Sequence, residues 1–137
     1  GLAGYDLIYI TFALSSASTT VANIKISGAT SGGVFRVWTA GPTSTAGDKF
    51  TMVGSAMINN FGIANQHKIL SSNISVTNFT VLDASNNITS ATTNARSGYC
   101  SYQEIWDELK IELSAGNIEG STVDERGLVT VYGMPKA

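Results

Sequence analysis

The sequence is poor in charge. Only 13% of its 137 residues are Asp, Glu, Lys or Arg, which is about half the share found in ordinary soluble domains. The eight Lys and Arg residues are spread singly along the chain, and the formal net charge is −2. A nucleic-acid surface needs clustered cations that release counterions from the phosphates. The composition therefore argues against DNA or RNA as a partner.

Cysteine and histidine are scarcer still, because each occurs once, as Cys100 and His67. One cysteine cannot form an internal disulfide, and a zinc site needs several His or Cys ligands. The Gly-x-Ser-x-Gly motif of serine hydrolases is also missing. We therefore expect no metal, no cofactor and no catalytic site. Cys100 is expected to be a partly buried small residue and His67 a surface residue.

Long apolar runs are absent. The longest, from Leu7 to Leu14, is interrupted by Thr11 and is too short to span a bilayer. We expect no membrane insertion. No signal peptide is visible, and a chain that begins at Gly1 without a preceding Met indicates a processed or excised segment.

Uncharged polar residues take the place of the missing charges. The chain has 31 Ser and Thr residues, 10 Asn and 14 Gly. Such a surface is typical of proteins in crowded assemblies or outside the cell, which points to a virion or a secreted protein. The alternative is a β protein that is simply rich in Thr and turn residues, and composition does not separate the two.

The clearest strand is Tyr5 to Leu14. Strand alternation places Ile8, Ile10, Phe12 and Leu14 on one face, and Leu7, Tyr9, Thr11 and Ala13 on the other. Neither face is strongly polar, so the strand is either central between packed sheets or covered by a neighbouring subunit. Together with the low charge, this strand supports subunit contacts and the expectation of a homo-oligomer.

Other segments rich in β-branched and aromatic residues predict further short strands. A bend is expected at Gly54 and a β-bulge near Asn78. The pattern from Glu104 to Leu113 fits a helix or a strand, and we favour a strand from about Asp107. The polar segment from Asp83 to Gly98 is expected to be an exposed excursion. The predicted strands are Val21–Ser27, Val34–Thr39, Lys49–Ile58, Asn73–Leu82, Asp107–Leu113 and Leu128–Tyr132.

About seven or eight short strands with no long helix predict an all-β fold. The regular spacing favours a single antiparallel β-sandwich of jelly-roll type over residues 1–137. No internal repeat and no second domain are visible.

One acidic cluster leaves an enzymatic alternative open. Glu104, Asp107, Glu108 and Glu112 lie close in sequence, and a glycosidase uses two carboxylates on one face. Glu108 and Glu112 would face alike in a helix or in a strand. Lys110 lies between them, and charges in this pattern usually form the solvated edge of an element, which we favour.

A calcium loop is also suggested and rejected. From Asp83 onward, oxygen-bearing side chains occupy alternate positions, as in a calcium-binding loop. However, Ile88 stands at the sixth position, where glycine is needed, and Asn94 stands at the twelfth, where the loop closes with Glu.

A ligand surface is the best functional prediction from the residues. Aromatic rings stack on the apolar faces of sugars while amides bind the hydroxyls, and binding residues often flank long loops. For the aromatic residues concerned, which include Trp106, packing in the core or in a subunit contact is an equal alternative. The predicted ligand-binding residues are Tyr99, Tyr102, Gln103, Trp38, Asn59 and Asn60.

The two ends of the chain carry recognisable motifs. Ser114-Ala-Gly116-Asn117-Ile118 is followed by Val129-Thr-Val-Tyr132-Gly133-Met134. Near the start, Tyr5-Asp6 opens an alternating strand, and Gly32-Gly33-Val34-Phe35 follows a second one. This pattern resembles bacteriophage tail-fibre, tailspike and virion-surface proteins. Two departures are the longer link from Ser121 to Gly127, and Val131 in place of the usual Leu.

The resemblance implies a β-sandwich module on the surface of a phage particle. It also implies a homotrimer in contact with other virion proteins, used for host attachment or particle structure. Together with the aromatic residues, it makes a host cell-surface glycan the expected ligand. The first rival is a carbohydrate-binding module of a secreted bacterial enzyme, and the second is a glycan hydrolase that uses the acidic cluster.

Overall fold

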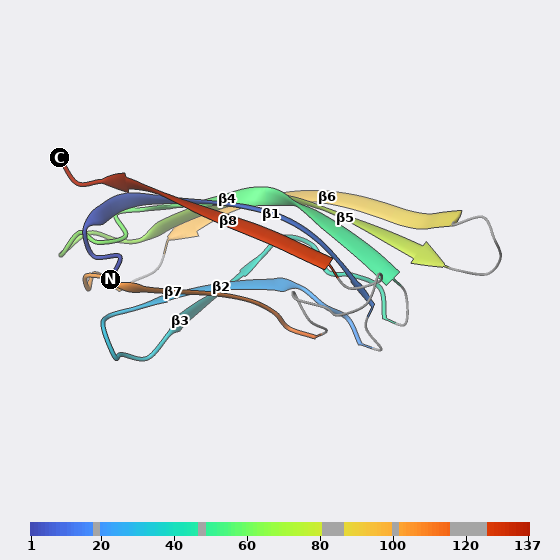
Figure 1. Cartoon of the computed structure of the whole chain (residues 1–137), viewed down its shortest axis with the longest axis horizontal. Helices are drawn as coiled ribbons and strands as arrows, with labels where there is room; N and C mark the ends of the chain where they lie inside the picture. The colour runs from blue at the N-terminus through green and yellow to red at the C-terminus, as the bar shows by residue number, and fades with distance from the viewer. Residues whose placement is uncertain (18–19, 47–48, 81–86, 100–101, 116–125) are drawn as a thin grey trace.

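The computed structural model describes residues 1–17, 20–46, 49–80, 87–99, 102–115 and 126–137. Every regular element in these ranges is a β-strand, and the strands form two antiparallel sheets that lie one above the other (Figure 1). The all-β prediction is therefore confirmed, with a sandwich-like arrangement of layers. None of the described residues belongs to a helix that could span a membrane.

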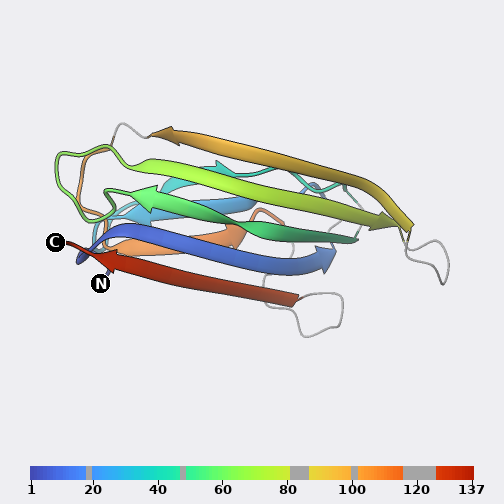
Figure 2. The same cartoon turned by 90° about the horizontal axis from the view of Figure 1, so that it is seen from above.

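The larger sheet has the strand order β6-β5-β4-β1-β8, and Figure 2 shows it from above. β4 is central, and β1 lies between β4 and the C-terminal edge strand β8, so the two ends of the chain lie in neighbouring strands. The smaller sheet has the order β3-β2-β7. The strands of the larger sheet are β1 (Tyr5–Ala17), β4 (Lys49–Asn59), β5 (Ile69–Thr80), β6 (Asn87–Tyr99) and β8 (Arg126–Pro135), and those of the smaller sheet are β2 (Ile24–Ala29), β3 (Arg36–Ala40) and β7 (Glu108–Leu113).

The hydrophobic core fills the space between the sheets. Alternate residues of β1, β4 and β5 point inward and are almost fully buried. Residues of β2 in the smaller sheet pack in the same core cluster. This alternation is what the period of a strand imposes when one face is covered. The main inward residues are Ile8, Ile10, Phe12 and Leu14 of β1, Ile24 and Ile26 of β2, Phe50, Met52 and Ile58 of β4, and Leu70, Ile74 and Val76 of β5.

Three details of the sequence prediction are confirmed. β1 contains the whole predicted strand and extends it to Ala17. The pairing of β5 with β6 shifts register between Asn78 and Phe79, at the position predicted for a bulge, although the extra residue is Thr89 of β6. The ambiguous acidic segment forms β7 from Glu108, within one residue of the predicted start.

Gly54 does not interrupt β4. Its pairing with both neighbouring strands continues through this residue without a register shift. A Cβ built at Gly54 would overlap the carbonyl oxygen of Asn73 on β5, so glycine here permits a close approach of two strands.

The prediction for the segment from Asp83 to Gly98 is wrong over most of its length. Residues Asn87–Tyr99 form β6, a 13-residue strand at the edge of the larger sheet, while residues 83–86 lie outside the described residues. The segment lacks the apolar alternation of a half-buried strand, because an edge strand rich in Thr and Asn gains its stability from backbone pairing with β5.

Candidate functional site

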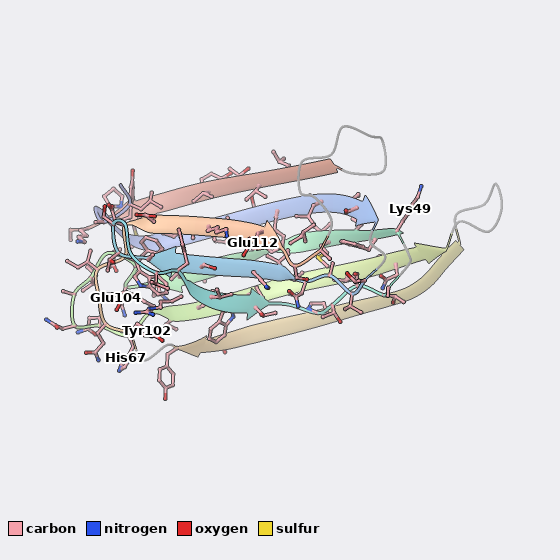
Figure 3. The ribbon with its side chains drawn as sticks, turned by 90° about the horizontal axis from the view of Figure 1, so that it is seen from below. Lys49, His67, Tyr102, Glu104 and Glu112 are labelled. Carbon is pink, nitrogen blue, oxygen red and sulfur yellow. The ribbon has the colours of Figure 1, made fainter. Side chains whose placement is uncertain are left out.

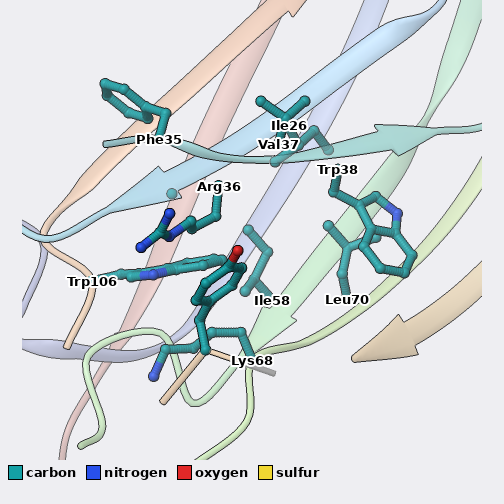
Figure 4. A pocket seen from close by; sticks show the side chains of 11 residues that line it. Ile26, Phe35, Arg36, Val37, Trp38, Ile58, Lys68, Leu70 and Trp106 are labelled. Atoms are coloured by element: carbon teal, nitrogen blue, oxygen red, sulfur yellow. The ribbon is translucent and has the colours of Figure 1, made fainter. Parts of the chain in front are cut away.

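A cavity of about 230 Å³ opens between the sheets beside the edge strand β3. Figure 4 shows side chains from both sheets and from the link between β6 and β7 converging on it. Four aromatic rings and two cationic side chains are among its walls. The lining residues are Ile26, Gly28, Phe35, Arg36, Val37, Trp38, Ile58, Lys68, Leu70, Tyr102 and Trp106.

The link from β6 to β7 closes one end of this cavity because backbone hydrogen bonds tie it to both sheets. The N–H of Trp106 donates to the carbonyl of Phe61 at 3.0 Å, next to β4, and the N–H of Asp107 donates to Ala29 of β2 at 2.8 Å. The N–H of Asn65 donates to the carbonyl of Gln103 at 2.8 Å. These bonds hold the short segment that carries Tyr102, Glu104 and Trp106 in a defined position.

Trp106 forms an inner wall of the cavity. Its indole lies against the backbone of Gly28 on β2, where a Cβ would overlap the ring. Its other contact is an edge-to-face pair with Phe61, with ring centroids 5.7 Å apart at 78°, an arrangement that aromatic quadrupoles favour. The ring is 6% exposed, so it shapes the cavity from within the core.

Arg36 and Tyr102 stand at the mouth. The guanidinium carbon of Arg36 lies 4.0 Å from the centre of the Tyr102 ring, a cation–π contact. The Nε of Arg36 donates to Glu104 Oε1 at 3.3 Å, and the indole N–H of Trp106 donates to the same oxygen at 3.4 Å. Among the described residues Glu104 is the only carboxylate bound to this guanidinium, so its terminal nitrogens remain donors for a ligand.

Lys68 lies at the opposite wall and has a structural role. Its side chain is 2% exposed, and its Nζ donates to the carbonyls of Asn60, Ile63 and Gln66 at 2.6, 2.7 and 3.3 Å. A buried ammonium is tolerated when hydrogen bonds replace its hydration. The lysine thus holds together the turn between β4 and β5, and its carbon chain forms part of the cavity wall.

The size and chemistry of the cavity restrict its ligand. Its volume is below the roughly 300 Å³ at which typical small-molecule sites begin, so it can hold one small ring rather than an extended molecule. Aromatic walls suit a ring with an apolar face, and the guanidinium can donate to hydroxyl or carboxylate oxygens. A single sugar residue has both features.

The structure brings two of the predicted site residues to the cavity. Trp38 and Tyr102 line it from β3 and from the β6–β7 link. Trp38 packs against Gly98 of β6, so closely that a Cβ at Gly98 would overlap its ring. Trp38 is thus packed within the fold, as one of the two alternatives for the aromatic residues predicted, and it also lines the cavity.

Three other predicted residues gather around His67, at the same end of the molecule (Figure 3). The ring of Tyr99 makes an edge contact with the His67 ring at 5.5 Å, and Gln103 Nε2 lies 3.1 Å from His67 Nε2. Asn60, at a positive φ of 59°, donates from Nδ2 to the His67 carbonyl at 3.0 Å. The cavity lining does not include Tyr99, Gln103 or Asn60.

Asn59, the sixth predicted residue, is also separate from the cavity lining. It is exposed at the end of β4, paired with Ile69, which is paired in turn with Tyr99 of β6.

Sequence reasoning missed Arg36 and Lys68. In the short strand that holds both residues, alternation placed Arg36 on the same face as Trp38. This shared face was the sequence signal that could have indicated Arg36. Nothing in the sequence around Lys68 indicates burial, because its three carbonyl partners are backbone atoms of a turn.

The carboxylates of the acidic cluster contact different parts of the structure. Besides Glu104, Asp107 accepts the N–H of Ala3 at 2.7 Å, Glu108 accepts the N–H of Gly32, and Glu112 pairs with Lys110 at 3.0 Å. Glu108 and Glu112 do share one face of β7, as both the helix and the strand interpretations predicted. Each carboxylate nevertheless has its own partner.

No candidate metal cluster occurs among the described residues. The rejected calcium loop lies partly outside them, at residues 83–86, and its remainder belongs to β6. Cys100 also lies outside the described residues.

Comparisons with protein-family models, curated proteins and solved structures find no match to this chain. The resemblance to phage virion proteins therefore stays a prediction carried by its motifs. Of these, the Tyr-Gly-Met motif lies in β8 and the Tyr-Asp motif opens β1, while residues 116–125 lie outside the described part.

Proposed function

We propose that this chain is a non-catalytic module of a phage particle that binds one sugar residue of a host-surface glycan in the aromatic cavity. The observation that carries the proposal is the wall formed by Trp38, Tyr102 and Trp106 with the Arg36 guanidinium at the mouth. Rings offer a stacking surface for the sugar and the guanidinium offers donors for its oxygens.

The particle setting rests on the motifs at the two ends of the chain and on the low charge. Such a module would belong to a tail fibre, a tailspike or a head-surface appendage, in contact with other virion proteins and exposed outside the cell. We further propose that its fold is a variant of the jelly roll. The chain passes between the two sheets four times, and it distributes its eight strands as five and three rather than evenly.

A carbohydrate-binding module of a secreted bacterial enzyme would use the same cavity. The two proposals differ in assembly, because such a module is expected to be a monomer while the phage module is expected to be a trimer. The glycan hydrolase is less favoured, because Glu104, Asp107 and Glu112 are engaged by Arg36, Ala3 and Lys110 respectively.

The proposal is tested by titrating common monosaccharides into the protein and following amide and indole NMR signals. Binding should be weak, near the millimolar range or about −4 kcal/mol, and should shift the signals of Trp38 and Trp106. Tyr102→Ala should abolish the shifts, because it removes the ring under the Arg36 guanidinium. Arg36→Gln should weaken them.

Tyr99→Ala is the matched control, since it removes an exposed tyrosine at the same end that does not line the cavity. If no monosaccharide in the panel shifts these signals, or if Tyr102→Ala binds as the parent does, the proposal is wrong. A loss confined to Tyr99→Ala would place the site at His67 instead.

A further inference from the structure

Exposed apolar side chains are concentrated on one surface of the molecule. Fourteen large hydrophobic side chains are exposed among the described residues, and strand alternation puts eight of them on the outward side of the larger sheet. We call this surface the outer face. Its eight residues are Tyr9, Val53, Met57, Ile69, Tyr99, Leu128, Tyr132 and Met134.

Strand pairing makes these residues neighbours. Tyr9 of β1 pairs with Tyr132 of β8 on one side and with Met57 of β4 on the other, and the two tyrosine rings lie 6.0 Å apart. Ile69 of β5 pairs with Tyr99 of β6. The apolar groups of β8, β1 and β4 are therefore contiguous, while Ile69 and Tyr99 form a second pair beyond Asn59, the partner of Ile69 on β4.

The outer face lacks charge except at the starts of β4 and β8, where Lys49 and Arg126 hold outward positions. Over residues 7–13 of β1, 51–57 of β4, 69–77 of β5, 95–99 of β6 and 128–134 of β8, every outward position has an uncharged residue. Between the apolar groups lie hydroxyl and amide side chains such as Thr11, Ser55 and Asn73. Contiguous exposed apolar groups such as those of β8, β1 and β4 often mark interaction surfaces on soluble proteins.

Such a face is compatible with a copy of itself. Two charged faces of the same kind would repel one another, whereas a face without charge has no such penalty. A hollow of about 190 Å³, lined by Tyr9, Met57 and Asn73 with neighbouring serines, lies on this sheet. The protruding Tyr132 ring is 54% exposed close by, so the face offers both a projection and a hollow to an identical partner.

The area is sufficient for a stable contact. Five strands about 4.8 Å apart, each with about nine residues that rise about 3.3 Å, cover roughly 700 Å² in projection. A standard interface buries about 800 Å² on each partner. Sheets that pack face to face are the ordinary arrangement inside a β-sandwich.

We propose that copies of this chain assemble with their outer faces against one another, so that the outer face becomes the core of a homo-oligomer. The glycan cavity opens between the sheets at the edge strand β3, so the assembly leaves it accessible.

The test is the mass in solution by light scattering and sedimentation. The parent protein should give a multiple of 14.4 kDa. The double variant Met57→Lys with Tyr132→Lys should sediment as a monomer, because each copy would bring two buried ammonium groups into the contact. Both residues are exposed, so circular dichroism and the melting profile of the monomer should remain those of a folded β protein.

Two further proteins sharpen the result. Val21→Lys with Val34→Lys adds the same charge at hydrophobic residues that are 50% and 74% exposed outside the outer face, and it should assemble as the parent does. The variant Met57→Glu with Tyr132→Glu should be monomeric alone and should assemble when mixed with the lysine variant, since unlike charges would then meet across the contact.

A monomeric parent at concentrations well above micromolar overturns the proposal. So does a lysine variant that keeps the mass of the parent, a control that dissociates equally, or a mixture that stays monomeric. None of these outcomes bears on sugar binding, which is measured separately at the cavity.

Discussion

The indole ring of Trp106 lies so close to the backbone of Gly28 that any side-chain carbon at Gly28 would overlap the ring atoms Cε3 and Cδ2. This relationship joins the β6–β7 link to the smaller sheet. Both residues line the cavity, so the absence of a side chain on β2 makes room for the indole in the cavity wall.

Gly28→Ala should therefore destabilise the protein. The indole of Trp106 cannot shift freely to make room for the added methyl group, because it also packs against Phe61 in an edge-to-face contact. Overpacking of this kind costs about 1–3 kcal/mol, measurable as a lower midpoint of urea unfolding. Gly4→Ala is the control, since a Cβ at Gly4 meets nothing within 4 Å, and an equal loss in both variants would contradict the packing described for Trp106.

Lys68→Met should destabilise the turn between β4 and β5. Methionine keeps the apolar chain in the cavity wall but leaves the carbonyls of Asn60, Ile63 and Gln66 without their shared donor. Hydrogen bonds from a charged group contribute about 1.5–3 kcal/mol, and we expect a loss of about 2–3 kcal/mol in the free energy of unfolding. Lys136→Met, at the exposed end of the chain, should leave stability unchanged.

Hydrogen exchange provides a second measurement on Lys68→Met. The amides of residues 60–68 should exchange faster than in the parent, while those of β2 and β7 should not change. Unaltered exchange in the turn would show that the ammonium does not hold it.

Asp107→Ala should release the N-terminal segment. The carboxylate of Asp107 accepts the N–H of Ala3 at 2.7 Å, and this bond lies over the start of β1. Its loss should cost about 1–2 kcal/mol and should abolish the protection of the Ala3 amide against hydrogen exchange.

Asp6→Ala is the matched control for Asp107→Ala, because no hydrogen bond involves the Asp6 carboxylate within the described residues. It should leave the Ala3 amide protected. Protection that persists in Asp107→Ala would mean that the segment is held by the backbone bond from Leu2 to the Asp107 carbonyl alone.

The sequence by itself determined the strands that have a buried face. Alternation in Tyr5–Leu14 and in the segment before Leu113 predicted β1 and β7, because only a strand buries every second residue. A broken period also indicated a bulge near Asn78, but the extra residue is Thr89 on β6, opposite Asn78 and Phe79. The same criterion of alternation missed β6, an edge strand whose pairing is with the backbone of β5 and leaves no pattern in the side chains.

The tertiary structure alone decided which of the aromatic and amide residues lie together. Trp38 and Tyr102 are 64 positions apart in the sequence and meet at one cavity because β3 is the edge of the smaller sheet. Tyr99, only three positions before Tyr102, belongs to the outer face. Arg36 joins the site through a contact with Tyr102, and Lys68 through the carbonyls of a turn. Neither contact is encoded in local spacing, because packing between sheets brings together residues whose separation along the chain is arbitrary.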